Sequence, residues 1–320
     1  MVGALFVTGC TTIGAHIISN PDTYLASHFQ DIDLQRFDTE KRTYCLNLEP
    51  PCIKYLYAKA YQPAKFTDNT NVYYTVDASG NGVTNRFTYT ATPEMFNRKQ
   101  GTAILFHGFG GKKEAMLVTS IYFRALGMDV IAVELFGHGE SDRDFVFGAK
   151  EHGIISRLIE HIDSTASLTK PVIAIGHSMG ALPTANTMLE SGEVDGAILM
   201  APMTRFDDAA TFYLAYKSPL LNRLFSGHLD DIVSAAMKKK NISPTETDIS
   251  EIISQTTEPT LIINSDVDTV SPPDRFAHLD NELIQVEVVK GRSHASLIAF
   301  DEYDATTVET WLANNFGSAP

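Results

Sequence analysis

A chain of 320 residues with 44% hydrophobic and 20% charged residues has the composition of a globular enzyme and can bury a substantial core in one domain or two. Its formal net charge of −14 argues against electrostatic binding to nucleic acid or anionic lipid, because such binding requires clustered Lys and Arg side chains that contact phosphate groups. No apolar run approaches the roughly 18 residues that a transmembrane helix needs.

The first residues resemble the end of a bacterial lipoprotein signal. Val2 to Val7 are apolar or small, and Val7-Thr8-Gly9-Cys10 has the order of a lipobox: an aliphatic residue, two small residues and a cysteine. The match is partial, because no Lys or Arg precedes Cys10 and the apolar stretch is short for a signal. We expect residues 1–10 to be a remnant of such a signal with a lipid anchor at Cys10. The alternative is a short apolar terminus that packs on the body.

The remaining cysteines form an even pair. Cys45 and Cys52 are seven positions apart across Pro50-Pro51. A disulfide that closes this loop would contribute ~2.5 kcal/mol in the chain-entropy model, and it implies an oxidising compartment. The alternative is two unrelated thiols. Both cysteine patterns favour the bacterial cell envelope, or secretion, over the cytoplasm.

The first part of the chain shows little regular pattern. We expect residues 11–66 to form an irregular N-terminal leader with short helical pieces that packs on the core. Two alternating runs follow, Asn71 to Asp77 and Val83 to Ala91, and the turn signal Ser79-Gly80-Asn81-Gly82 lies between them. The main domain is expected to span residues 67–320.

From Thr102 onward, short apolar runs alternate with helical segments. The expected strands are 102–106, 129–135, 172–175, 197–200, 261–263 and 283–289, and the expected helices are 113–126, about 149–168, 181–190 and about 302–316. This alternation predicts right-handed crossovers and an α/β fold, with a mostly parallel sheet and helices on both faces. Ligand chemistry in such sheets lies at the carboxyl ends of the strands, where the Gly-rich loops of this chain fall.

The alternation of strands and helices is interrupted between Met203 and Glu258. About 55 residues separate two core strands there, whereas a crossover helix needs only about a dozen. The insertion at about 204–254 is therefore predicted to be a helical cap over the mouth of the active site. Its apolar cluster consists of Phe212, Tyr213, Leu220, Leu221 and Phe225. The alternative is additional packing over the sheet.

The segment Gly176-His177-Ser178-Met179-Gly180 fits the pattern G-x-S-x-G and lies between an expected strand and an expected helix. This is the context of a nucleophile elbow. The turn strains the serine backbone, so Gly176 and Gly180 are needed for strand and helix to approach each other. Ser178 Oγ would stand at the helix N-terminus, where the dipole favours developing negative charge. The alternative is a purely structural turn.

A serine hydroxyl needs a base to remove its proton, and a histidine fixed by an acid is suited to this role. Of the ten histidines, His294 follows the last expected strand and comes last in the order that the G-x-S-x-G arrangement requires. His107, His138 and His177 lie inside Gly-rich loops, where a turn of small residues explains them equally well.

Two aspartates, Asp266 and Asp268, follow the strand 261–263, and strand alternation does not separate them. Here the chain resembles the α/β-hydrolase family. In its members this strand is followed by the pattern G-x-x-D, then by a short turn and a proline. Ser265 takes the place of that glycine. The resemblance therefore implies Asp268 as the acid that orients His294. Asp266 is the alternative, and we expect it to cap backbone N–H groups of the turn.

The resemblance extends over about residues 71–316 and rests on four motifs in order. His107-Gly108-Phe109-Gly110 resembles the family's oxyanion loop, which implies that the backbone N–H groups of Phe109 and Met179 hold the oxyanion. One such donor is typically worth ~3–4 kcal/mol. The loop 136–142 resembles the G-H-G-x-S-D segment of the branch with monoacylglycerol lipases, lysophospholipases and proline-type aminopeptidases. That branch often has Asp where Glu134 stands, a departure that touches no triad residue.

The resemblance implies a serine hydrolase that cleaves carboxylic esters, either lipid-like or small acyl esters, through a Ser178–His294–Asp268 triad and an acyl-enzyme. It implies no metal and no organic cofactor, and the sequence holds no clustered His/Cys ligand pattern and no phosphate-cradling motif. One alternative is a serine peptidase or amidase, which would need acidic residues beneath the cap for the substrate amine. The other is a non-catalytic binding scaffold, and the complete set of motifs counts against it.

Overall fold

The computed structural model describes residues 34–62, 72–80, 82–92, 98–217 and 227–317, together with residues 15, 16, 18–21, 95, 96 and 223. The expected lipobox with Cys10 lies outside the described residues. So do Leu220, Leu221 and Phe225 of the expected cap cluster, and the side chain of Tyr213. No helix in the described part is long and apolar enough to cross a membrane.

The core of the molecule is an eight-stranded sheet in the order β1-β2-β6-β5-β7-β8-β9-β10. The strands are β1 (Glu40–Cys45), β2 (Cys52–Ala58), β5 (Gly101–Phe106), β6 (Met128–Val133), β7 (Val172–His177), β8 (Gly196–Met200), β9 (Thr260–Ser265) and β10 (Ile284–Val289). From β6 to β10 the neighbouring strands are parallel, whereas β1 and β2 run antiparallel to their neighbours. The predicted parallel α/β architecture is therefore confirmed.

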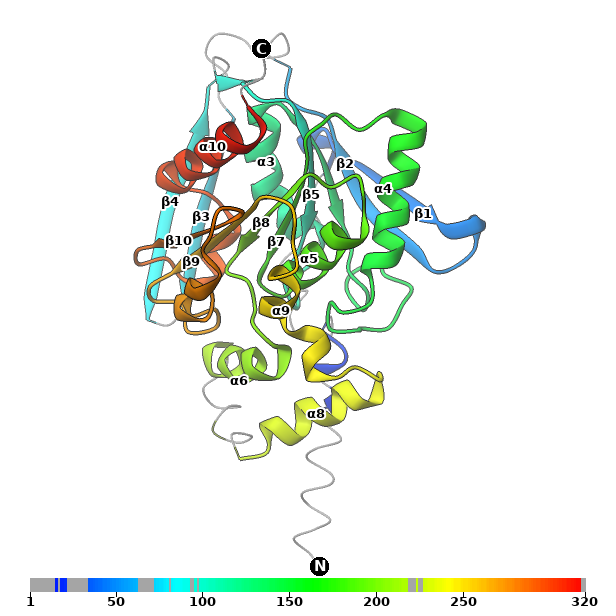
Figure 1. Cartoon of the computed structure of the whole chain (residues 1–320), viewed down its shortest axis with the longest axis vertical. Coiled ribbons are helices and arrows are strands. Elements are labelled where there is room, and N and C mark those ends of the chain that lie inside the picture. Colours follow the sequence, from blue (N-terminus) through cyan, green and yellow to red (C-terminus); the bar gives the residue numbers. More distant parts are fainter. Residues whose placement is uncertain are drawn as a thin grey trace, which may run out of the picture.

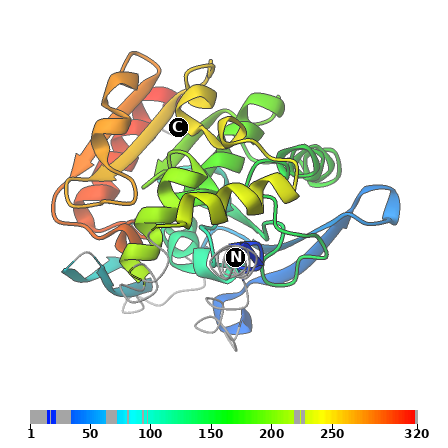
Figure 2. The same ribbon diagram turned by 90° about the horizontal axis from the view of Figure 1, so that it is seen from below.

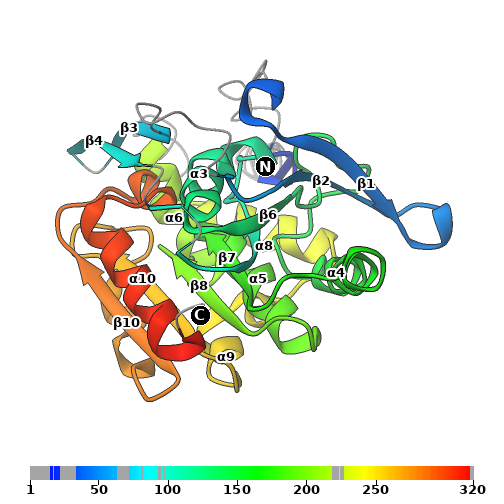
Figure 3. The same ribbon diagram turned by 90° about the horizontal axis from the view of Figure 1, so that it is seen from above.

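The central strands are buried on both faces, as their continuous apolar runs predict. Every residue of β5, β7, β8 and β9 is buried. Two helices, α3 (Leu117–Leu126) and α10 (Glu302–Phe316), pack on one face, and α4 (His152–Ala166) and α5 (Ala181–Glu190) pack on the other (Figures 1 and 3). The helix expected from residue 113 begins with a short 3-10 turn, Lys113–Met116, before α3.

The irregular leader predicted for residues 11–66 was wrong for residues 40–58, because β1 and β2 extend the main sheet. β1 is an edge strand whose first four residues are exposed, so its sequence lacks the apolar alternation of a half-buried strand. Cys45 and Cys52 are register partners of this hairpin and form the expected disulfide. The hairpin projects from the body (blue in Figure 3).

A second hairpin, β3 (Val72–Gly80) and β4 (Val83–Ala91), forms a separate two-stranded sheet, as its alternation and turn predict. Tyr74 and Tyr89 belong to the buried cluster beneath α3 and α10. The opposite face is solvent-exposed and carries polar cross-strand pairs, including Thr75 with Thr88. The hairpin thus covers one edge of the core with its apolar side inward.

The segment predicted as a cap contains three described helices, α6 (Phe206–Lys217), α8 (Leu229–Lys239) and α9 (Ile249–Ile253). Figures 1 and 2 show α6 and α8 lying across the lower end of the body, beyond the end of β8. Ile232, Val233 and Ala236 on one side of α8 are buried, whereas the acidic residues of its first turn are exposed. The segment is therefore an amphipathic layer with its apolar side toward the core.

Candidate active site

Ser178 lies in a sharp turn between β7 and α5. Its φ is +55°, a left-handed value that is strained for a residue with a side chain. A Cβ on Gly176 would lie 2.4 Å from Thr184 Oγ1, and a Cβ on Gly180 would lie 2.4 Å from Phe106 O. Both positions therefore require glycine, which is the steric reason for the G-x-S-x-G spacing.

Three polar side chains from separate loops form one hydrogen-bonded chain. His294 Nε2 lies 2.8 Å from Ser178 Oγ, and His294 Nδ1 lies 2.7 Å from Asp268 Oδ2. Only 7% of Ser178, 3% of His294 and 2% of Asp268 is exposed, so the chain is largely shielded from water. The structure thus brings together the three residues that the sequence singled out for catalysis, in the order that proton transfer from serine to histidine requires.

Asp268 is held ionised although it is buried. Burial alone would raise the pKa of its carboxyl, but the neighbouring His294 and the N–H groups of Ser271 and Val270 lower it below its ordinary value. Those N–H groups donate to Oδ1 at 3.1 Å and 2.9 Å, which leaves Oδ2 for His294. Asp266, by contrast, accepts a hydrogen bond at 2.7 Å from the N–H of Gly291.

The loop that carries His294 is held by a residue of β4 and by a residue next to Ser178. Asn85 of β4 donates to Gly291 O at 2.8 Å and accepts from Ser293 N–H at 2.7 Å. His177 Nε2–H donates to His294 O at 3.0 Å, and burial and the nearby His294 lower the pKa of His177 to about 3, so this imidazole is neutral. Sequence reasoning missed Asn85, because it lies more than 200 positions from the loop that it supports.

Arg292, a residue of the same loop, connects it to the start of α10. Its guanidinium is buried, pairs with Asp301 at 2.9 Å and with Asp304, and donates to the carbonyl oxygens of Ser296 and Ala299 at 2.6 Å and 2.8 Å. The two carboxylates belong to the start of α10, so this ion cluster ties His294's loop to that helix. A planar, multidentate cation suits this role better than a lysine would.

The predicted oxyanion loop lies against the nucleophile turn. A Cβ on Gly108 would lie 3.2 Å from Ser178 Cβ, so the backbone just before Phe109 passes close to the serine. Met179 follows Ser178 directly and is fully buried. The two residues predicted to donate N–H groups thus belong to loops that meet beside Ser178.

A buried ion cluster, which sequence reasoning also missed, anchors the far end of the oxyanion loop. Lys113 Nζ lies 2.6 Å from Glu134 Oε2, and the N–H of Lys113 donates to Glu134 Oε1 at 2.9 Å. The same ammonium reaches Glu140 at 2.7 Å and Glu114 at 3.2 Å. A Cβ on Gly139, whose φ is +51°, would lie 2.2 Å from Glu134 Oε2. The second glycine of the Gly137-His138-Gly139 loop thus leaves room for this carboxylate.

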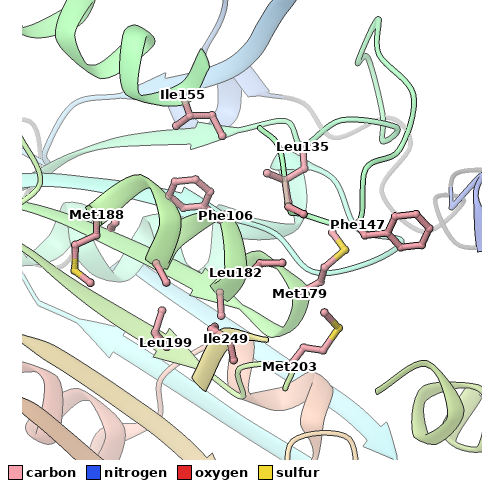
Figure 4. Close-up of a cluster of buried hydrophobic side chains, with 14 of the residues drawn as sticks. Phe106, Leu135, Phe147, Ile155, Met179, Leu182, Met188, Leu199, Met203 and Ile249 are labelled. Carbon is pink, nitrogen blue, oxygen red and sulfur yellow. The ribbon is translucent and has the colours of Figure 1, made fainter. Parts of the chain in front are cut away.

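The surroundings of the serine are apolar. The N–H of Met203 donates to Ser178 O at 3.2 Å, and Met179 and Met203 belong to one buried cluster (Figure 4). Phe206, at the start of α6, contacts the ring of Phe109 at 5.6 Å. The start of the insertion therefore contributes an aromatic ring, that of Phe206, to the packing around Phe109. Phe212 of the expected apolar cluster is 44% exposed.

The acidic residues at the start of the insertion are already paired. Arg205 donates to both carboxylate oxygens of Asp207, at 3.0 Å and 2.5 Å, and lies 3.8 Å from Asp208. Asp230 and Asp231 are exposed on the first turn of α8. Among the described residues, no group of three or more His, Cys, Asp or Glu side chains is arranged to hold a metal ion.

The chain is similar to known hydrolases. A family model described as "Serine aminopeptidase, S33" matches residues 97–252, a span that includes the oxyanion loop and the nucleophile turn and ends before Asp268 and His294. No curated protein matches the chain by sequence.

Solved structures with the same fold include two esterases. An esterase of Pyrococcus furiosus is 19% identical over 77% of this chain and 92% of its own, with a TM-score of 0.57. The esterase Est2 of Thermogutta terrifontis is 14% identical over 88% of this chain and 94% of its own, with a TM-score of 0.55. The 2,6-dihydroxy-pseudo-oxynicotine hydrolase is 12% identical over 87% of this chain and 68% of its own, with a TM-score of 0.57. Together with the family match over residues 97–252, these structures show that the chain has the α/β-hydrolase fold.

Proposed function

We propose that this protein is a serine hydrolase that cleaves carboxylic esters, with Ser178 as nucleophile, His294 as general base and Asp268 as the orienting acid. The observation that carries the proposal is the hydrogen-bonded chain from Asp268 through His294 to Ser178, with distances of 2.7 Å and 2.8 Å. A nucleophile, a base within hydrogen-bond reach and an acid that orients the base are the parts that acyl transfer needs.

In this mechanism His294 Nε2 takes the proton of Ser178 Oγ while that oxygen attacks the ester carbonyl. The negative charge that develops on the carbonyl oxygen is held by the N–H groups of Phe109 and Met179. His294 then donates the proton to the leaving alcohol, and the acyl-enzyme forms. A water molecule activated by the same histidine releases the acid and restores Ser178. The Asp268 carboxylate stabilises the imidazolium at both stages.

We propose short- to medium-chain acyl groups as the preferred substrates. Met179 and Met203 belong to one buried apolar cluster around the nucleophile turn, and Phe206 contacts the ring of Phe109 in the predicted oxyanion loop. The Est2 esterase, which shares the fold, has been solved with butyrate bound and with propionate bound. Each methylene that is buried in such surroundings contributes about 0.8 kcal/mol, or roughly fourfold in specificity, until the space is filled.

The alternative is a peptidase that recognises a free amine, as the name of the matching family model suggests. Such a site needs unpaired carboxylates close to the serine. Asp207, near the start of the insertion, accepts hydrogen bonds from Nε and Nη2 of Arg205. This pairing favours the esterase over the peptidase.

We further propose that the protein works in the cell envelope or is secreted. The Cys45–Cys52 disulfide supports an oxidising compartment. The lipid anchor at Cys10 stays a prediction from the lipobox-like order Val7-Thr8-Gly9-Cys10. Mass spectrometry of the protein from its native host tests it, because diacylglycerol on Cys10 gives a defined mass. An unmodified cysteine there would contradict the anchor.

The function is tested by measuring kcat/KM for p-nitrophenyl esters from acetate to dodecanoate, with Ser178→Ala as the matched control. We expect the value to rise with chain length, to pass through a maximum and then to fall, and the control to be inactive. A fluorophosphonate probe should add one phosphonyl group at Ser178. Faster cleavage of aminoacyl-nitroanilides than of any ester would favour the peptidase, and labelling at another serine would refute the assigned nucleophile.

A further inference from the structure

His138 lies at the centre of the contact between the two loops that border the nucleophile turn, and it is fully buried. Its Nε2 accepts a hydrogen bond at 3.1 Å from the N–H of Gly110 in the oxyanion loop. Its Nδ1 lies 3.0 Å from Phe136 O in its own loop. The imidazole therefore links a backbone group of one loop to a backbone group of the other.

These two contacts determine which ring nitrogen carries the proton. The N–H of Gly110 can only donate, so His138 Nε2 must be unprotonated, and the carbonyl of Phe136 can only accept, so Nδ1 must carry the hydrogen. Burial and the nearby His107 lower the pKa of His138 to about 3, which agrees with a neutral ring. Both polar atoms of this buried side chain are thus satisfied in one tautomer.

The contact acts on the peptide that directly follows the predicted oxyanion donor, the N–H of Phe109. Gly110 directly follows Phe109 and has a left-handed φ of +68°, so its N–H orientation determines how the backbone leaves Phe109. The rings of Phe109 and His138 also meet edge to face, at 6.1 Å and 89°. The two ends of the loop are held separately, by His107 Nε2, which accepts from Leu135 N–H, and by Glu134. In the middle, the turn is closed by the N–H of Gly111, which donates to Gly108 O at 3.0 Å, and His138 is the side chain that holds Gly110 from outside the loop.

We propose that neutral His138 is a positioning residue for the oxyanion hole, which keeps the N–H of Phe109 aimed at the carbonyl oxygen of the reacting acyl group by holding Gly110. This inference rests on the proposed function. It predicts that His138 affects kcat rather than KM. The negative charge on the carbonyl oxygen, which the N–H of Phe109 would stabilise, develops only when Ser178 attacks.

The test compares His138→Leu, which removes the acceptor at Nε2, with His138→Gln, whose amide oxygen can accept from the same N–H. Leu158→Ala, in the buried face of α4, serves as a control for lost stability at a site outside both loops. Two rates are measured: phosphonylation of Ser178 by a fluorophosphonate, and turnover of p-nitrophenyl butyrate. Phosphonylation places a negative oxygen in the same hole and needs no knowledge of the natural substrate.

We expect His138→Leu to lower both kcat and the phosphonylation rate about 10- to 100-fold with KM changed less than about twofold, since loss of a whole oxyanion donor costs about 10²–10³ in kcat. His138→Gln should recover to within about fivefold of wild type. If His138→Leu does not fold, His138→Met takes its place. Equal losses in both His138 variants, a change in KM alone, or rates matching those of Leu158→Ala would overturn the proposal.

The same data separate this proposal from the proposed function. Wild-type protein that is labelled at Ser178 but hydrolyses no ester refutes the esterase, while the labelling rates of the His138 variants still decide the positioning role. Wild-type protein that is folded and not labelled refutes both.

Discussion

The ammonium of Lys113 is the cation at the centre of the buried ion cluster, and Lys113→Met tests how strongly this cluster stabilises the fold. Nζ lies 2.6 Å from Glu134 and 2.7 Å from Glu140, and only 1% of the Lys113 side chain is exposed. Methionine fills a similar volume without a charge. The substitution therefore leaves the carboxylate of Glu134 buried without its ammonium partner.

Two lines of reasoning give the size of the effect. Removing one partner of a buried ion pair costs about 3–5 kcal/mol. Burial alone would raise the pKa of Glu134, but the opposite effect of His107 and Lys113 is larger, so the pKa is lowered from the ordinary 4.5 to about 2. At 1.36 kcal/mol per tenfold change in proton affinity, this corresponds to about 3 kcal/mol for all surroundings of Glu134 together, of which Lys113 supplies only a part. Because the folded-state pKa is the lower one, this stability is present above about pH 4.5 and is lost as the pH falls towards about 2.

Urea unfolding measures the loss directly. At pH 7.5 we expect the free energy of unfolding of Lys113→Met to fall by about 3 kcal/mol, with an unchanged denaturant slope. The double variant Lys113→Met with Glu134→Gln should recover most of it, because no buried charge is left unpaired. Its stability should also fall less than that of wild type between about pH 4.5 and pH 2. A loss below about 1 kcal/mol in the single variant would refute the reasoning.

Three further outcomes follow from the geometry. Asp268→Asn should lower kcat about 10⁴-fold, whereas Asp266→Asn should lower it far less, because Asp266 accepts a hydrogen bond from a loop N–H and not from His294. The two variants are compared by their kinetics at matched stability, and a larger loss of kcat in Asp266→Asn would reverse the assignment. Gly180→Ala places a Cβ 2.4 Å from a main-chain oxygen and should lower the free energy of unfolding by about 2–3 kcal/mol; an unchanged urea midpoint contradicts this. Cys45→Ser with Cys52→Ser should lower it by ~2.5 kcal/mol, and thiol counting on native protein should find neither cysteine free.

Much of the fold could be predicted because its signals are local. The central strands are buried on both faces, so each reads as a continuous apolar run, and β5 and β7 lead directly into Gly-rich segments at their carboxyl ends. The glycines around Ser178 are required by clashes in and next to the turn, and the five-residue pattern is recognisable because it lies between an expected strand and an expected helix. The position of His294 after the last strand likewise depends only on chain order.

Other features were decided by contacts that no local pattern encodes. Asp266 and Asp268 are indistinguishable by alternation, and only the packed loop turns one towards His294 and the other towards a backbone N–H. β1 is a polar edge strand that forms because β2 is already paired with β6. Asn85 meets the loop of His294 across more than 200 positions of sequence, and His138 meets Gly110 across 28. Such partners depend on how distant segments pack, because a hydrogen bond forms between whichever donor and acceptor the folded chain brings together.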